Sequence, residues 1–391
     1  MSIEPLDYKS ECVSVYYDGK LIEDVPNEQV ISWSYHSIFE NNKDALYASL
    51  YCGGKTIDEV CPEHLKSNWK SLNNKMKAYF RSFAIAKINL NHNCIFDMIP
   101  DRFLIEYYGA KSQISDWVVH NYQKPKDYDY LFELAKVAYT IKNQKLNIDT
   151  TPLLKDVANP LTKKAIVKYN NIEPYIKYDI FGSKTGRLST INSSFPILNM
   201  NKEHRCVLTP SNDWFVELDY NGAELRTFLA LANEQQPDCD IHEWNAKNIF
   251  NDFSREEAKT AILAWLYGET KNNKAEQIYK KEEVLNKYWD GSTVKTIYGM
   301  EIEADRKHAI NYLIQSTFAQ LSLRQMIKVF NFLKDKKSFI AFTVHDNIVI
   351  DLSEEDKKDL KQVINIYSET DLGKFKVNLK VGSNYGYLKK I

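Results

Sequence analysis

The chain has 391 residues, 44% of them apolar, which is enough to bury a large core in more than one domain. Lys and Arg total 51 against 52 Asp and Glu, so the protein is not basic overall. This excludes a uniformly basic surface, but a protein that binds nucleic acid needs positive charge only in the groove that faces the phosphates. The six cysteines are scattered without a CxxC pair, which indicates free thiols rather than disulfides or a zinc site.

The N-terminus and the hydropathy pattern carry no targeting signal. The first residues lack the basic and apolar regions of a secretory leader, and no apolar run reaches membrane-spanning length. We therefore expect a soluble, cytoplasmic protein without a membrane partner. The charge is uneven, because residues 136–187 hold ten basic residues against four acidic ones. On its own this stretch indicates a solvated helical face.

The first clear elements lie before and around the middle of the chain. A helical pattern covers residues 128–146, and a Gly- and Ser-rich loop occupies 179–190. The apolar segment WFVELDY at 214–220 predicts a buried strand. The segment after it, 221–233, has the apolar spacing of a helix.

A helix is predicted over residues 254–268. Ser254 and Glu257 have the spacing of a capping box, and Gly268 ends the pattern. One stripe of this helix, at a spacing of four residues, carries two cations, a leucine and a tyrosine: Arg255, Lys259, Leu263 and Tyr267. The stripe suits a nucleotide, because cations hold phosphates while the other two side chains contact sugar and base. The alternative is an amphipathic surface helix with solvated cations.

The last third of the chain predicts a helix and a hairpin. A long helical pattern runs over 304–333 with a break near Ser316, and 338–352 reads as two apolar strands with Asp346 at their turn. Asp219 similarly ends the strand at 214–220. If the two strands are neighbours, both carboxylates emerge at one edge of a sheet, where they can hold a pair of cations. The alternative for each residue is an ordinary strand-end or turn aspartate.

The order of motifs resembles that of the family A (Pol I-like) DNA polymerases. DYNGAELR at 219–226 resembles motif A, the helix from Arg255 to Gly268 resembles motif B, and VHDN at 344–347 resembles motif C. Further matches occur in the family's order: TGRLST (185–190), DIHEWNAKNIF (240–250), TIYGM (296–300), AINYLIQSTFAQ (309–320) and VGSNYG (381–386).

The resemblance implies a two-metal active site. Asp219, Asp346 and the backbone carbonyl of Tyr220 would hold two Mg²⁺ ions, which Mn²⁺ can replace. Lys259 would protonate the leaving pyrophosphate. Glu224 would be the steric gate against a ribose 2′-hydroxyl. The full set of residues that would contact the dNTP is Arg255, Lys259, Leu263, Tyr267 and Glu224.

The resemblance also implies contacts to primer-template DNA. Arg187 would reach the minor groove, where it reads acceptors common to all correct pairs. His345 would support the primer terminus, while His242 is expected to be structural. The full set of predicted DNA-binding residues is Thr185, Arg187, Arg226, Asn311, Gln315 and His345.

Several positions depart from the family pattern. Leu263 replaces an aromatic residue, and Asn347 replaces the glutamate of motif C, so the metal site loses a charge. Asn221 and Gly222 replace Ser-Gln, which should loosen a minor-groove contact. HNCIFD at 92–97 resembles the second motif of the family's 3′–5′ exonuclease domain, but a full nuclease set is missing. We therefore expect no proofreading.

These patterns predict an α/β (α+β) right-hand polymerase with an antiparallel palm sheet, helical fingers and a reduced thumb. The predicted segments are an N-terminal, degenerate exonuclease-like segment (1–130), a thumb-like helical region (131–184), the first part of the palm (185–250), the fingers (251–295) and the second part of the palm (296–391). The predicted function is DNA-dependent extension of a primer 3′-hydroxyl with dNTPs. We expect a monomer of phage type, with an unidentified processivity or replisome factor.

Two alternatives remain at this stage. A single-subunit RNA polymerase shares the palm chemistry, but Glu224 speaks against it. A catalytically weak DNA-binding accessory protein would not need to keep the four residues Asp219, Asp346, Arg255 and Lys259 together.

Overall fold

The structure, a computed structural model, describes residues 2–6, 14–23, 25, 30–42, 44–90, 93–268 and 270–391. Cys12 and His92, which belong to patterns discussed above, lie outside these residues. The chain divides into two compact units, Met1–Asn143 and Gln144–Ile391. Among the described residues, no helix combines the length and the apolarity that a membrane span requires.

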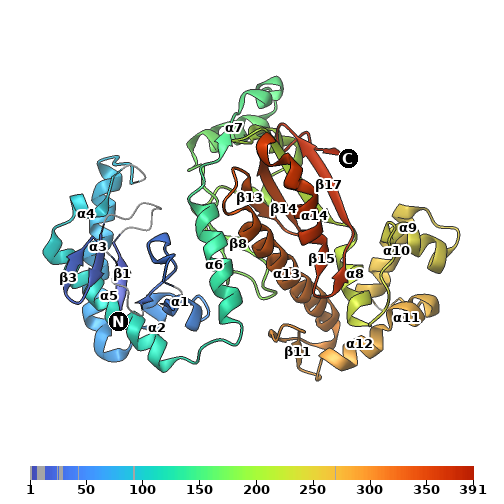
Figure 1. Cartoon of the computed structure of the whole chain (residues 1–391), viewed down its shortest axis with the longest axis horizontal. Helices are drawn as coiled ribbons and strands as arrows, with labels where there is room; N and C mark the ends of the chain where they lie inside the picture. Colours follow the sequence, from blue (N-terminus) through green and yellow to red (C-terminus); the bar gives the residue numbers. More distant parts are fainter. Residues whose placement is uncertain are drawn as a thin grey trace. The chain divides into compact units, whose positions relative to one another are not determined.

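The first unit combines short strands with long helices (Figure 1). Its strands β1 (Ile3–Pro5), β2 (Val15–Tyr17) and β3 (Lys20–Ile22) form an antiparallel sheet, and β4 (Ile31–Ser32) pairs in parallel with β5 (Leu46–Tyr47). The helices of this unit are η1 (Ser37–Phe39), α1 (Ala48–Tyr51), α2 (Ile57–Val60), α3 (Glu63–Ile85), α4 (Ile95–Met98), α5 (Asp101–Asn121) and α6 (Tyr128–Lys142).

A buried ion pair joins strand β1 to helix α5 in the first unit. The Nζ of Lys111 lies 2.8 Å from Glu4 Oε2, and both side chains are almost completely buried. Glu4 Oε1 also accepts hydrogen bonds from the backbone N–H of Trp33 and from the hydroxyl of Ser115. Buried charges require such additional partners, so this network fixes the register of β1 against α5.

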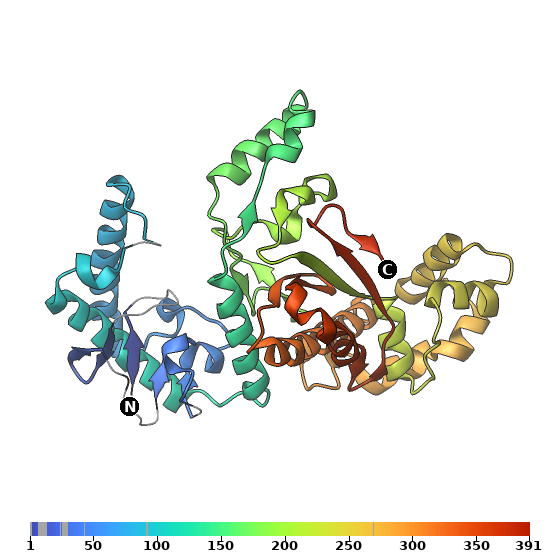
Figure 2. The same cartoon turned by 45° about the horizontal axis from the view of Figure 1, so that its top comes forward.

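The second unit begins with an arm that projects from the main sheet (Figure 2). The arm contains part of the basic stretch noted above, the first residues of which lie on α6 of the first unit, and Leu161 and Val167 on α7 are exposed. The elements that precede the main sheet are β6 (Asn147–Ile148), η2 (Thr151–Asp156), α7 (Pro160–Asn171), β7 (Tyr178–Asp179), β8 (Ser189–Thr190), η3 (Ile197–Asn199), η4 (Lys202–Val207) and β9 (Leu208–Thr209).

A five-stranded antiparallel sheet forms the centre of the second unit, as predicted for a palm. Its order is β13-β14-β10-β17-β18. The bounds are β10 (Trp214–Tyr220), β13 (Phe339–Val344), β14 (Asn347–Leu352), β17 (Val377–Gly382) and β18 (Lys389–Lys390). The predicted strand at 214–220 and the predicted hairpin at 338–352 are both confirmed.

Helices α13 (Arg306–Leu333) and α14 (Leu360–Ser368) pack on one face of this sheet (Figure 1). From β10, Tyr220 stacks on Tyr367 with ring centroids 4.4 Å apart and meets Phe318 of α13 edge-on. The predicted break near Ser316 is wrong, because α13 is continuous. Ser316 is fully buried there, so tertiary packing outweighs the modest helix propensity of serine.

A helical lobe follows the end of β10 (Figure 2). The capping box predicted at Ser254 and Glu257 is present and opens α10. The buried side chains of α8, α10, α11, α12 and α13 share one apolar cluster. The helices of the lobe are α8 (Ala223–Leu231), α9 (Ile241–Asn245), the π-turn η5 (Ala246–Phe250), α10 (Arg255–Tyr267), α11 (Asn273–Tyr279) and α12 (Lys281–Tyr288).

Small two-stranded ribbons and a short helix complete the second unit. They are β11 (Thr293–Lys295) with β12 (Glu301–Glu303), η6 (Glu354–Asp359), and β15 (Glu369–Thr370) with β16 (Gly373–Lys374).

Gly222 makes the turn from β10 into α8, and we predict that alanine there is destabilising. Its φ is +60°, and an added Cβ would lie 2.2 Å from Cγ2 of Ile241. Gly222→Ala should lower the free energy of unfolding by about 2–4 kcal/mol, measured by chemical denaturation. Gly299→Ala is the control, because its φ is +84° but nothing lies within 4 Å of its Cβ. Equal losses in the two variants would contradict the steric explanation.

Candidate active site

Two aspartates meet at one end of the central sheet. Asp219 of β10 pairs in register with Asn347 of β14 on one side and with Asn378 of β17 on the other. Asp346 directly precedes Asn347, in the turn that joins β13 to β14. The sequence-based expectation that the strands of the two aspartates are neighbours is confirmed, and it rests on the antiparallel register of β10 and β14.

Burial disfavours the charged forms of both carboxyl groups. Burial and then the neighbouring carboxylate of Glu217 raise the pKa of Asp219 to about 6, with Asp346 adding to the shift and Lys380 opposing it. Burial likewise raises the pKa of Asp346, against the positive charges of Arg187 and His345. An Nη of Arg187 lies 3.6 Å from Oδ1 of Asp346. The site thus concentrates negative charge that a cation would stabilise.

The donor set fits a hard divalent cation. Among the residues that the structure describes, no group of three or more His, Cys, Asp or Glu side chains could enclose a metal. A structural zinc site is therefore a poor match for the described residues, since zinc takes four protein ligands there. Two aspartates suit Mg²⁺, which keeps waters and takes further oxygen ligands from substrate phosphates.

The N-terminal end of α10 is held by an acidic residue that the sequence analysis did not single out. Arg255 donates to Oδ2 of Asp240 at 2.9 Å, and Asp240 also caps α9 through the backbone N–H of His242. Burial lowers the pKa of His242 to about 4; Asp240 opposes this shift, whereas the positive charges of Arg255 and Lys259 add to it. The imidazole of His242 is therefore neutral at pH 7 and lies beside the two cations of the predicted stripe. Lys259 itself is exposed.

The C-terminal end of α10 faces the aspartates. Burial and then the carboxylate of Glu224 raise the pKa of Tyr267, with Asp346 adding and Arg187 opposing. The hydroxyl of Tyr267 therefore lies in the electrostatic field of Glu224, Asp346 and Arg187. Leu263 is half-buried and packs against the apolar cluster shared by the helices of the lobe. The structure thus brings the predicted stripe, the predicted gate and the metal-binding edge together.

The predicted DNA-binding residues divide into two groups. Arg187 and His345 line one small hollow beside the sheet edge, and His345 is exposed with a φ of +54°. Thr185, two residues before Arg187, is buried. Asn311 and Gln315 lie together on α13 and are half-buried.

Arg226 was predicted to bind DNA, and this prediction is wrong. Only 1% of the residue is exposed. Its guanidinium donates to the backbone carbonyls of Asn221, Pro237 and Cys239, and to Oδ1 of Asn221. Four of the five N–H groups of Arg226 are thus used inside the protein, so Arg226 fixes the loop before α9.

Asn221 is likewise structural. Its Nδ2 donates to Oδ2 of Asp240 at 2.8 Å, and its Oδ1 accepts from the backbone N–H of Ile241. Asn221 therefore forms a link between the turn after β10 and Asp240. That a minor-groove contact is loosened at this position stays a prediction. The sequence gives no signal for this link, because 19 residues separate the partners.

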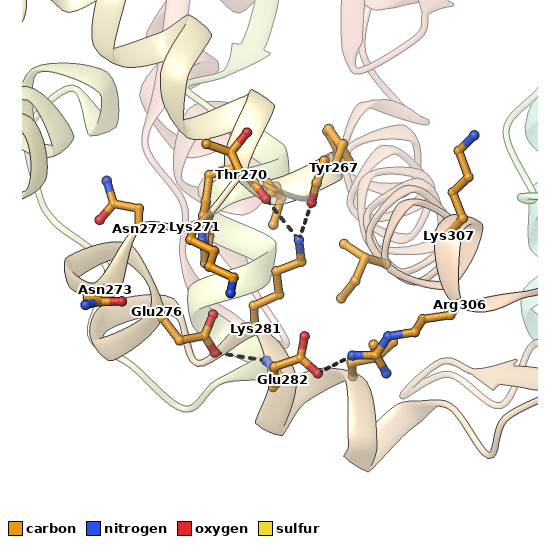
Figure 3. A pocket seen from close by; sticks show the side chains of 15 residues that line it. Tyr267, Thr270, Lys271, Asn272, Asn273, Glu276, Lys281, Glu282, Arg306 and Lys307 are labelled. Carbon is orange, nitrogen blue, oxygen red and sulfur yellow. Dashed lines mark hydrogen bonds and ion pairs between the residues drawn. The ribbon is translucent and has the colours of Figure 1, made fainter.

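A cavity of about 610 Å³ opens beside Tyr267, between the end of α10 and the start of α13 (Figure 3). Lys281 donates to the backbone carbonyls of Trp265 and Gly268 and so caps α10. Arg306 pairs with Glu282 at 2.6 Å. Lys271 and Lys307 also line the cavity and are exposed, which gives its rim positive charge.

Comparisons with known proteins agree with this geometry. Residues 292–389, which include β13, β14 and β17, match DNA polymerase family A. DNA polymerase I of Borreliella burgdorferi is 24% identical over 260 residues, or 52% of this chain, but the match covers only 29% of that protein. A solved structure of the POL domain of Pol1 from M. smegmatis, in complex with DNA primer-template and dNTP, has a similar fold. The two structures superpose with a TM-score of 0.64 at 12% sequence identity. The match covers 98% of this chain and 95% of the other chain.

The fold is therefore similar to that of a polymerase domain. The C-terminal part of the chain, residues 292–389, is similar to DNA polymerase family A.

We predict that Asp219→Asn stabilises the metal-free protein at neutral pH. The pKa of Asp219 in the folded state, about 6, is above the unfolded value, so this group makes stability fall as pH rises from about 4 to about 6. The substitution removes that cost, and the free energy of unfolding at pH 7 should rise by about 1–2 kcal/mol.

The gain should disappear below about pH 4, where Asp219 is protonated. Chemical denaturation at several pH values in a chelating buffer measures it. Asp252→Asn, at an exposed position, is the control and should not change the pH dependence. A constant difference between wild type and Asp219→Asn across this range would contradict the assignment.

Arg226→Met should affect stability rather than DNA binding. Three backbone carbonyls lose a charged donor, so the free energy of unfolding should fall by about 3 kcal/mol or more. Primer-template affinity, measured against salt concentration at a temperature where the variant is folded, should keep the wild-type slope. A reduced slope with unchanged stability would restore the original prediction.

Proposed function

We propose that this protein is a template-directed DNA polymerase that extends a primer 3′-hydroxyl with dNTPs. One observation carries the proposal: the register of β10 with β14 brings Asp219 and Asp346 to one end of the sheet, where Arg187 lies 3.6 Å from Asp346. The cations of α10 would hold the outer phosphates of a nucleotide, and the carboxylate edge would face its reacting α-phosphate. In the reaction, the primer oxygen attacks that phosphorus and pyrophosphate leaves.

Asp219 and Asp346 would hold two Mg²⁺ ions, with the backbone carbonyl of Tyr220 as a further ligand, and Mn²⁺ would be an alternative. Bound in this position, such ions activate the attacking hydroxyl and stabilise the leaving oxygen. The protein's own contribution is to hold two carboxylates at a buried edge, where their mutual repulsion favours binding of a cation.

Binding of the triphosphate would change the ion pairs at the start of α10. Arg255, now paired with Asp240, would turn to the phosphates, and Lys259 would join it and protonate the pyrophosphate. His242 is neutral, so it can donate one hydrogen bond to a phosphate oxygen without adding charge. Glu224 would crowd a ribose 2′-hydroxyl, and Tyr267 and Leu263 would border the base and sugar.

DNA would lie along the open edge of the sheet. Arg187 and His345 would contact the primer end, and Asn311 and Gln315 would contact the template side. Thr185 is buried and would support Arg187 rather than contact DNA itself. The cavity in Figure 3 would receive the unpaired template strand, because its rim carries exposed lysines next to Tyr267. We assign the projecting arm with α7 to a reduced thumb and the lobe from α10 to α12 to the fingers.

The first unit would not proofread. The carboxylate of strand β1, Glu4, is consumed by Lys111, Trp33 and Ser115 and cannot bind a metal without breaking a buried ion pair.

A primer-extension assay tests the proposed function. Wild type with Mg²⁺ should extend a matched primer with dNTPs, and Asp346→Asn should be slower by about a thousandfold, since metal-ion catalysis contributes several kcal/mol. Glu224→Ala should increase rNTP incorporation relative to dNTP while keeping dNTP extension. Equal extension by wild type and Asp346→Asn would exclude this site, and a wild-type preference for rNTPs would indicate an RNA polymerase.

A further inference from the structure

A row of polar side chains crosses the sheet next to the two aspartates. Glu217 and Asp219 alternate on β10, so they lie on the same face of the sheet, roughly 6.6–6.8 Å apart along the strand. Lys380 of β17 is in register opposite Glu217, and Asn347 of β14 is in register opposite Asp219. Neither Glu217 nor Lys380 belongs to the motifs that identified the site.

The carboxylate of Glu217 is held from two sides. Its Oε1 accepts from Nζ of Lys380 at 2.5 Å, and its Oε2 accepts from Nδ2 of Asn347 at 3.3 Å. Its side chain is only 4% exposed. Because both oxygens are occupied, Glu217 is positioned as a fixed negative charge rather than as a metal ligand.

Asn347 connects Glu217 to the turn that carries Asp346. The Oδ1 of Asn347 accepts from the backbone N–H of Val344, and its backbone carbonyl accepts from the hydroxyl of Thr343. These bonds close the β13–β14 turn, in which His345 has the unfavourable φ of +54°. A continuous set of contacts therefore runs from Glu217 through Asn347 to the turn of Asp346.

The identities of residues 217 and 347 depend on each other. A glutamate at position 347, as in the motif that this segment resembles, would face the carboxylate of Glu217 across the strands. Like charges at this distance repel, whereas the amide of Asn347 donates a hydrogen bond. The third acid of this site is thus on β10 instead of β14.

We infer that Glu217 is a positioning residue of the metal site. It supplies the negative charge that Asn347 does not, it orients Asn347 against the Asp346 turn, and Lys380 limits the strength of its charge. This inference rests on the proposed function, because it assumes that Asp219 and Asp346 bind divalent cations. A fixed charge this close to a poorly solvated site contributes directly to its attraction for cations.

The direction in which two substitutions change the Mn²⁺ affinity separates a charge role from a purely structural role. Mn²⁺ binding to the full chain without DNA is measured by the loss of the free-ion signal in electron paramagnetic resonance. Glu217→Gln should weaken Mn²⁺ binding at least about threefold, and Lys380→Gln should tighten it at least about twofold. Both substitutions break the same ion pair, so a structural role would weaken binding in both variants.

A double-mutant cycle tests the link to Asn347. Asn347→Glu alone should lower Tm in the absence of metal, because two carboxylates then face each other. In the double variant with Glu217→Gln, the Asn347→Glu substitution should lower Tm by less than it does as a single substitution. The Mn²⁺ affinity of the double variant should return to within about twofold of wild type. Additive effects would refute the coupling, and this part of the test remains if Glu217→Gln alone does not fold.

Glu4→Gln is the matched control, since Glu4 is also a buried, ion-paired glutamate but lies in the first unit. It should leave Mn²⁺ affinity unchanged. Equal Mn²⁺ affinities for wild type, Glu217→Gln and Lys380→Gln would overturn the inference. The proposed function fails separately, if wild type does not extend a primer although these affinities shift as expected.

Discussion

The antiparallel register between β10 and β14 is the constraint on which the site depends. It places Asp219 opposite Asn347, and therefore places the turn that holds Asp346 beside the end of β10. A slip of one residue would turn Asp219 to the helix-covered face, where Tyr220 packs against Tyr367 and Phe318. The register of the central strand thus decides the setting of both residues, because it buries Tyr220 under the helices and leaves Asp219 half-buried on the other face.

The carboxylates at this edge of the sheet are only partly neutralised by neighbouring cations. Asp219 and Asp346 are buried carboxyl groups, and Arg187 is a distant partner for Asp346 at 3.6 Å. By contrast, Glu217 is fully engaged by Lys380 and Asn347. The site therefore combines one acid that an ion pair holds in place with two acids that are less tightly engaged, and such an arrangement can bind ions without a closed cage of ligands.

Asp240 is the second organising residue of the unit. It receives Arg255 from α10 and Asn221 from the turn after β10, and it caps α9. The hydrogen bonds and the charge of Arg255 hold the pKa of Asp240 well below its usual range, although burial opposes them. Arg255 therefore joins the start of α10 to the start of α9 through this carboxylate.

The sequence by itself determined the local elements and the identity of the reactive groups. Apolar alternation predicted β10 and the β13–β14 hairpin, and the capping box predicted the start of α10, because these signals arise between residues close in the chain. The tertiary structure alone decided which charged groups are free to act. In the sequence Arg226 resembles a DNA-binding cation, but in the structure its guanidinium donates to backbone carbonyls. Glu217 resembles an ordinary strand residue, but it lies two residues from Asp219 and pairs with Lys380. These partners are 5 to 163 residues distant in the chain, so burial and register, rather than local pattern, set the role of each charge.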